Sequence, residues 1–131
     1  MKVFSPEKAN ALIPILSPLI DDLWTKRREL AIRLLENDAM LRAHSREAPS
    51  DRRVSRHFTE LKAEIVRIIN RIEAHGCVVK DLDLGLLDFP SLRGGRPIYL
   101  CWKAGEDHIA HWHGTDETFL DRKPLDGRPS A

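Results

Sequence analysis

The sequence predicts an α+β protein, in which a long antiparallel helical hairpin packs with a small antiparallel β-meander. Apolar residues in the first 75 positions recur at three- and four-residue steps, which is the period of an α-helix. From Cys77 onward, short runs rich in β-forming residues alternate with glycine-containing turns. With 131 residues the chain has the size of one domain. We therefore expect a single domain over residues 1–125, composed of a helical hairpin (5–75) and a β-rich part (76–125).

The first helix has a clear start and an uncertain middle. In "FSPE", Ser5 suits the N-cap and Pro6 the first helical position. Pro14 and Pro18 lie inside the apolar pattern and predict a kink or a break, because proline lacks the amide hydrogen. Since Ser17-Pro18 repeats the start signal, a short helix followed by a long one is an alternative. The apolar stripe comprises Ile13, Leu16, Ile20, Leu23, Leu30, Leu34 and Leu41.

The second helix carries a cleaner seam. "HSREAPSDRR" interrupts the helical pattern, with Pro49 ending one helix and Ser50 capping the next. Gly76 closes the second helix. Its apolar residues are Val54, Phe58, Leu61, Ile65, Ile68 and Ile72, at alternating four- and three-residue steps.

Two polar residues, Arg27 and Asn37, occupy seam positions of the first helix. They either set the register or contact a partner, or they lie at the seam's edge with their polar ends in water. The combined seam offers more apolar surface than a small sheet covers, so we expect a homodimer.

Four apolar runs form the expected meander: "CVV", "GLLDFPSL", "PIYLCW" and "HIAHWH". Gly85, Gly94-Gly95 and Gly105 separate them, as turn residues do. Beyond Gly114 little periodicity remains, and residues 126–131 are expected to be a disordered tail.

Composition narrows the class of protein. Twenty-one basic and 20 acidic residues give a net charge of +1, which makes nucleic-acid binding an unfavoured function. No apolar run is long enough to span a membrane, and the N-terminus does not resemble a secretory signal. The two cysteines are too few for a disulfide scaffold and are expected to be buried thiols in the cytoplasm.

A candidate site lies in "IAHWHGTDE". Residues two apart in a strand share a face, so His111 and His113 would point the same way, about 7 Å apart at their backbones. Asp88 lies in an apolar segment and needs a partner. Together these three are the candidate ligands for a divalent metal ion. A hydrogen-bonded structural pair of Asp88 and His113, or an acid–base pair, explains the same residues.

A wider set of polar residues surrounds these positions. Lysine and arginine side chains there could bind an anionic group, or pair with nearby carboxylates. The candidate ligand-binding residues are Lys80, Asp81, Asp88, Glu106, His113 and Arg122.

The same region carries a family resemblance. "FSPEKANALIP" at the N-terminus and the later motifs together resemble the prokaryotic domain-of-unknown-function family twenty-two-oh-three, over nearly the whole chain. The resemblance implies a fold and a cytoplasmic location and points to no reaction. The motifs are Lys80-Asp81, Gly85 to Pro90, Leu100-Cys101-Trp102, Gly105-Glu106, Trp112-His113, Arg122 and Pro124-Leu125.

Three functions remain open. The favoured one is a small binding module whose His/carboxylate cluster holds a small ligand or a metal ion. The alternatives are a self-associating structural or interaction protein that uses the helical hairpin, and a hydrolase-type enzyme with Asp88 and His113 as its acid–base pair. The residues do not decide whether the protein is an enzyme.

Overall fold

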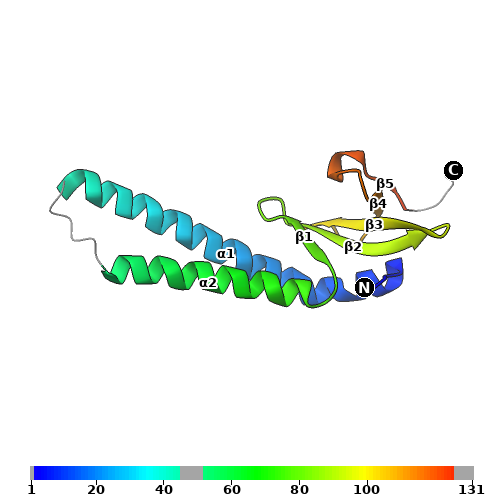
Figure 1. Cartoon of the computed structure of the whole chain (residues 1–131), viewed down its shortest axis with the longest axis horizontal. Coiled ribbons are helices and arrows are strands. Elements are labelled where there is room, and N and C mark those ends of the chain that lie inside the picture. Colours follow the sequence, from blue (N-terminus) through cyan, green and yellow to red (C-terminus); the bar gives the residue numbers. More distant parts are fainter. Residues whose placement is uncertain (1, 45–51, 126–131) are drawn as a thin grey trace.

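The computed structural model of the chain describes residues 2–44 and 52–125, and it confirms the α+β architecture (Figure 1). Two helices, α1 (Pro6–His44) and α2 (Arg52–Glu73), pack together. A five-stranded antiparallel sheet and the short 3-10 helix η2 (Phe119–Asp121) follow. The strands are β1 (Val78–Asp81), β2 (Leu86–Arg93), β3 (Arg96–Lys103), β4 (His111–Gly114) and β5 (Lys123–Pro124). The expected end and cap signals at Pro49 and Ser50, and the tail 126–131, lie outside the described residues.

Helix α1 runs through both internal prolines without a break, so the predicted break and the two-helix alternative are wrong. Pro14 and Pro18 are exposed, and their rings therefore do not disturb the buried face. From Ala9 to Leu23 that face is packed, with Leu16 and Leu23 inaccessible to solvent. Burial of this stripe offsets the loss of two helical hydrogen bonds.

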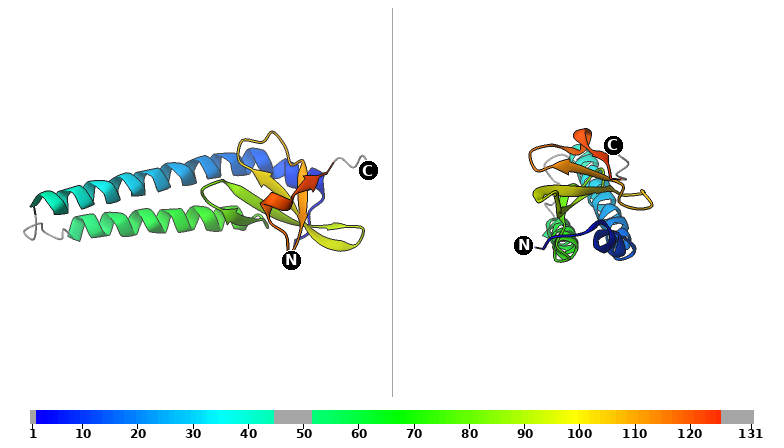
Figure 2. Two further views of the ribbon diagram at one scale, coloured as in Figure 1. Left: turned by 90° about the horizontal axis from the view of Figure 1, so that it is seen from above. Right: turned by 90° about the vertical axis from the view of Figure 1, so that its right-hand side faces the viewer.

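The helices extend well past the sheet as a two-helix arm (Figures 1 and 2). We define the arm as residues 28–44 and 52–60. The last fully buried residue of α1 is Leu23 among the residues whose burial is described, whereas Leu34 and Leu35 in the arm are 47% and 71% exposed. The core thus lies at the sheet end of the hairpin. It contains Leu61, Ile65, Ile68 and Ile72 of α2 as predicted.

The strands follow one another in the order β1-β2-β3-β4-β5. A two-residue turn at Gly94-Gly95, where both glycines have positive φ (57° and 80°), pairs Arg93 with Arg96 and sets the register of β2 and β3. One face of the sheet, including Phe89 and Trp102, packs against the helices.

The predicted strand "HIAHWH" is shorter than expected. Strand β4 begins at His111, and the three residues before it are not in the sheet. The backbone amide of Ile109 instead donates to Oδ1 of Asn10 at 2.6 Å, so this segment is tied to α1. A helix side chain has taken the hydrogen bond that a neighbouring strand would have made.

The turn between β1 and β2 is fastened to α1. The Nε1 of Trp24 donates to the carbonyl of Leu82 at 2.8 Å, and a Cβ on Gly85 would lie 2.9 Å from the Trp24 ring. Arg27 forms an ion pair with Asp83 in the same turn. Arg27 is therefore held by a partner within the chain, at the edge of the helix seam.

Candidate functional site

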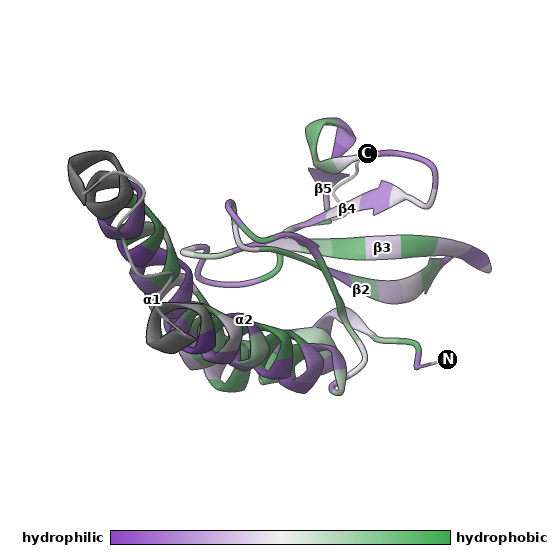
Figure 3. Cartoon of the chain, turned by 60° about the vertical axis from the view of Figure 1, so that its left-hand side comes forward, coloured by the Kyte–Doolittle hydropathy of each residue, from purple (hydrophilic) through white to green (hydrophobic). Residues whose placement is uncertain are grey.

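The face of the sheet opposite the helices carries the polar residues that the sequence singled out. Residues 114–125 curl over this face, with η2 on the far side of the sheet from α1 and α2 (Figure 3). Asp88, Cys101 and His111 form one row across β2, β3 and β4, and His113 lies two residues further along β4. Alternation along each strand sends these side chains to the same face.

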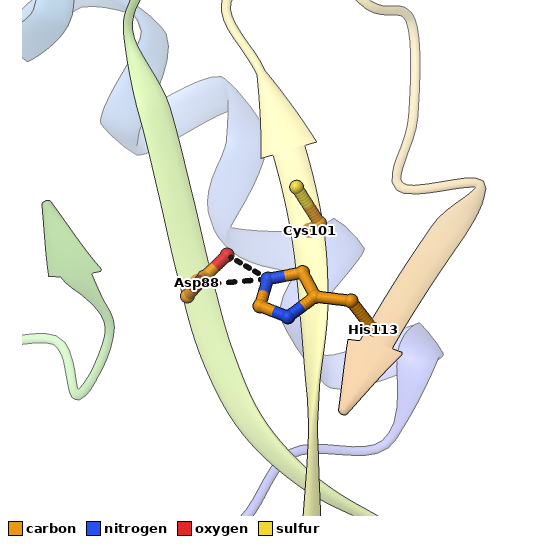
Figure 4. A group of neighbouring side chains, drawn as sticks. All are labelled: Asp88, Cys101 and His113. Carbon is orange, nitrogen blue, oxygen red and sulfur yellow. Dashed lines mark hydrogen bonds and ion pairs between the residues drawn. The ribbon is translucent and has the colours of Figure 1, made fainter. Parts of the chain in front are cut away.

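Asp88 and His113 form a buried pair. Their residues are 2% and 3% exposed, and Nε2 of His113 lies 3.1 Å from both carboxylate oxygens of Asp88 (Figure 4). Nδ1 of His113 lies 2.8 Å from the carbonyl oxygen of Gly114. A carbonyl only accepts, so Nδ1 carries a proton and the ring turns Nε2 toward Asp88.

Cys101 is the third member of this cluster. Its residue is 1% exposed, and Sγ of Cys101, a carboxylate oxygen of Asp88 and a ring nitrogen of His113 all lie within 4.8 Å of one another (Figure 4). We call these three residues the Asp–Cys–His cluster.

Burial controls the ionisation of the cluster. Desolvation raises the pKa of Asp88, and the facing imidazole of His113 and the charge of Lys80 oppose that rise. Desolvation, reinforced by the charge of Asp88, raises the pKa of the Cys101 thiol to about 11. Near neutral pH Cys101 is therefore a thiol in the metal-free protein, and it offers no activated nucleophile.

The Asp–Cys–His cluster brings together residue types that could hold a metal ion. Bond lengths to zinc place two ligand atoms of a tetrahedral site roughly 3.3–3.8 Å apart. The separation between Asp88 and His113, 3.1 Å, is close to that value. The hydrogen bond from Nδ1 to a backbone carbonyl is the usual outer support of a metal-binding histidine.

The predicted metal ligands are only partly brought together. Asp88 and His113 belong to the cluster, but His111 does not, and Cys101 stands as its third member. Nδ1 of His111 is buried without a hydrogen-bond partner among the described residues. Two other carboxylates of this region are engaged in ion pairs, Asp83 with Arg27 and Glu106 with Arg122.

Arg122 and Glu106 flank the cluster rather than joining it. They form an ion pair at 2.7 Å, and Glu106 also accepts from the backbone amide of Lys103 at 2.9 Å. The guanidinium of Arg122 opposes the rise in the pKa of the Cys101 thiol, and it lies over the Phe119 ring, 4.3 Å from its centroid. This pair supports Cys101 and holds η2 against the sheet.

A pocket of about 520 Å³ opens beside the cluster. Four of the six predicted ligand-binding residues line it, namely Lys80, Asp81, Asp88 and His113. Its remaining lining residues are Leu84, Leu86, Glu117, Thr118, Phe119 and Leu120.

The wall that η2 contributes is held in a fixed conformation. Thr118 and Asp121 form a reciprocal capping box around this short helix. Glu117 accepts from the amide of Gly114 and from Nζ of Lys123, both at 2.6 Å. These bonds keep Phe119 and Leu120 at the pocket.

The sequence comparison identifies the family. A family model described as "Uncharacterized conserved protein (DUF2203)" matches residues 2–125. The chain belongs to the DUF2203 family. No curated protein and no solved structure matches it. Among the described residues of this DUF2203 chain, neither helix combines the length and apolar character that crossing a membrane requires.

Cys101 is the site residue that sequence reasoning missed in this DUF2203 chain. The sequence alone predicts a buried thiol at this position. The signal lay in the two-residue turn: Arg93 pairs with Arg96 across Gly94-Gly95, and counting back along both strands places Asp88 opposite Cys101.

Proposed function

We propose that this DUF2203 protein is a metal-binding module whose Asp–Cys–His cluster holds a divalent transition-metal ion. The observation that carries the proposal is the convergence of three buried ligand-type side chains from three adjacent strands within 4.8 Å. A divalent ion would replace the protons of the cluster and be neutralised by one carboxylate and one thiolate. The thiolate and imidazole favour zinc or a related ion over magnesium or calcium.

Three protein ligands leave one tetrahedral position open. Catalytic and ligand-binding zinc sites have this composition, whereas structural sites use four protein ligands. Asp88 and His113 also line the pocket, so the open position is expected to face it. The module would then present the ion to a small ligand.

Cobalt(II) titration of untagged protein tests the metal site. Binding should produce thiolate-to-cobalt charge-transfer absorption at one equivalent, and His113→Ala and Cys101→Ala should weaken binding by about tenfold or more. His111→Ala and Cys77→Ala are the matched controls, because they remove the neighbouring imidazole and the other buried thiol. Equal losses in all four variants, or no charge-transfer band, would refute the site.

The acid–base pair is a second candidate for the same residues. It is supported by the 3.1 Å separation of Nε2 of His113 from the Asp88 carboxylate, which is hydrogen-bond reach. In this reading the metal-free protein hydrolyses a substrate in the pocket. Hydrolysis of model esters that survives exhaustive chelation and is lost in Asp88→Asn would favour the enzyme over the metal module.

Self-association is a further candidate, and we propose that the arm mediates it. Ile32 and Leu35 lie three residues apart on α1 and are 47% and 71% exposed. Arg28 and Glu36 flank this apolar pair on neighbouring turns. A two-fold axis near Ile32 would bring Arg28 opposite the partner's Glu36, which is the self-complementary pattern of an isologous dimer.

A further inference from the structure

We propose that the pocket beside the Asp–Cys–His cluster binds a small monocarboxylate with an apolar chain. The carboxylate would bridge the metal ion and the ammonium group of Lys80, and the chain would lie on Leu84, Leu86 and Leu120. One of the two carboxylate contacts rests on the proposed metal site. The other belongs to the protein alone.

The apolar part of the ligand follows from the pocket walls. Leu86 is buried at 5% exposure in the floor, whereas Leu84 and Leu120 are 42% and 88% exposed at the edges. The capping box of η2 fixes the backbone that presents Leu120. An alkyl chain would remove this exposed leucine surface from water, which is favourable in proportion to the area covered.

The charge of the ligand follows from which groups in the pocket are already engaged. Oδ1 of Asp81 accepts from the amide of Leu84 at 2.9 Å, Glu117 pairs with Lys123, and Asp88 holds His113. Each carboxylate therefore has its own donor. An incoming cation would therefore compete with donors that these carboxylates already have, whereas an anion would not.

Lys80 supplies the positive charge that would bind the carboxylate of the ligand. It has no ion pair with a carboxylate in the part of the chain that the structure describes, and its Nζ lies 5.4 Å from the centroid of the Tyr99 ring. It is close enough to Asp88 to act on that carboxylate electrostatically. Its ammonium group therefore stands beside the cluster and is available to an anion.

The charge balance favours a monoanion. Asp88 and a Cys101 thiolate would neutralise a divalent ion, Glu117 pairs with Lys123, and Asp81 accepts from the amide of Leu84. The one cation that lines the described part of the pocket, Lys80, has no carboxylate partner there. A carboxylate matches that charge, whereas a phosphate dianion would need a further cation. The volume of about 520 Å³ lies within the range of small-molecule sites.

Calorimetric titration with hexanoate tests the inference, using acetate, hexan-1-ol and hexylamine as comparison probes. Zinc-loaded protein should bind hexanoate about tenfold or more tightly than acetate, because the longer chain covers more apolar surface. Hexan-1-ol and hexylamine should bind more weakly than hexanoate, since neither carries the anionic group.

Two variants test the contacts to the carboxylate and to the apolar chain of the ligand separately. Lys80→Met, which keeps the length of the side chain, should weaken both carboxylates about fivefold or more. Leu120→Ser should weaken hexanoate and leave acetate unchanged. Lys62→Met, at an exposed lysine of α2 away from the pocket, should change neither.

The outcomes distinguish this inference from the metal site. Zinc binding with no preference for hexanoate, or with binding insensitive to Lys80→Met, overturns the carboxylate pocket and leaves the metal centre standing. If zinc does not bind, the metal centre fails, and hexanoate binding to the metal-free protein decides the pocket. Binding that depends on Lys80 supports it, and the lack of such binding overturns it.

Discussion

Asp88 and His113 compensate each other in the metal-free protein, because each would be a buried polar group without its partner. Replacing Asp88 with alanine leaves Nε2 of His113 buried without its hydrogen-bond partner. We expect the free energy of unfolding to fall by about 3 kcal/mol or more, as for other broken buried pairs. Urea unfolding of the chelator-treated protein measures this loss.

A double variant shows whether the loss comes from the pair. Asp88→Leu combined with His113→Leu removes both polar groups and should cost less than the two single changes added together. Asp107→Ala, which removes an exposed carboxylate, should change stability by less than about 0.5 kcal/mol. Strict additivity of the two leucine substitutions would contradict the coupling.

Cys77 makes the protein sensitive to alkali. Burial raises the pKa of this thiol from its ordinary value of 9.0 to about 12, and Sγ lies 3.5 Å from the carbonyl oxygen of Ile72. A folded-state pKa above the unfolded one means that the unfolded chain loses its proton first as the pH rises. The contribution of this thiol to the free energy of unfolding is therefore fully present below pH 9, and it is lost progressively between pH 9 and pH 12.

Because of this one thiol, the free energy of unfolding should fall by about 1.4 kcal/mol per pH unit in that range. Cys77→Ala should reduce the slope, whatever it does to the stability at neutral pH. Urea unfolding at a series of pH values from 8 to 11 measures both. Parallel stability curves for the two proteins would show that Cys77 does not carry the effect.

At the scale of elements, hydrophobic periodicity predicted both helices because their stripes are long and regular. In the seam of α2, Leu61, Ile65, Ile68 and Ile72 are buried as predicted, whereas Phe58 is half-buried. The continuity of α1 could not be predicted, because proline chemistry argues for a break and only the packing of Leu16 and Leu23 overrides it. Local preference is weak where a whole buried stripe opposes it.

In the strands too, the sequence pattern predicted some features, whereas others depend on tertiary contacts. Alternation identified Asp88 and His113 as polar residues in need of partners. It did not identify Cys101 as their neighbour. The Gly94-Gly95 turn sets Asp88 opposite Cys101, but the position of His113 also depends on the register of β4 against β3. The shortened β4 depends on Asn10, which lies 99 positions away from Ile109 in the sequence. Contacts of that range leave no signal in a single sequence.

Pro14 offers a test of how α1 is held together. The proline at this interior position removes the amide that would donate to the carbonyl of Asn10. Pro14→Ala should therefore stabilise the protein by about 1–2 kcal/mol, after subtracting the greater entropy of the unfolded alanine chain. Thermal unfolding measures the change. Pro6→Ala is the control, because proline at the first helical position costs nothing and its removal should give no gain.

On the scale of the whole molecule, the protein has two ends with different character (Figure 2). At one end the sheet and η2 enclose the cluster and its pocket, and at the other the arm carries apolar side chains into solvent. Helices α1 and α2 join the two ends, and Trp24 and Arg27 fasten the β1–β2 turn to α1. A partner bound to the arm would leave the pocket accessible.

The proposed dimer follows from this separation. Leu35→Glu places a charge in the middle of the exposed apolar stripe and should weaken self-association about tenfold or more, as measured by sedimentation velocity over a range of concentrations. Leu92→Glu is the matched control, because Leu92 is 55% exposed but belongs to β2 at the far end of the molecule.

A charge swap tests the proposed two-fold arrangement directly. Arg28→Glu alone would bring two carboxylates together across the axis, because the partner's Glu36 lies opposite, and the dimer should weaken. Arg28→Glu combined with Glu36→Arg exchanges the charges and should restore the affinity of the unaltered protein. If the arms pair through another face, the single and the double variant should self-associate with the same affinity. A protein that is monomeric at every concentration would contradict the proposed dimer altogether.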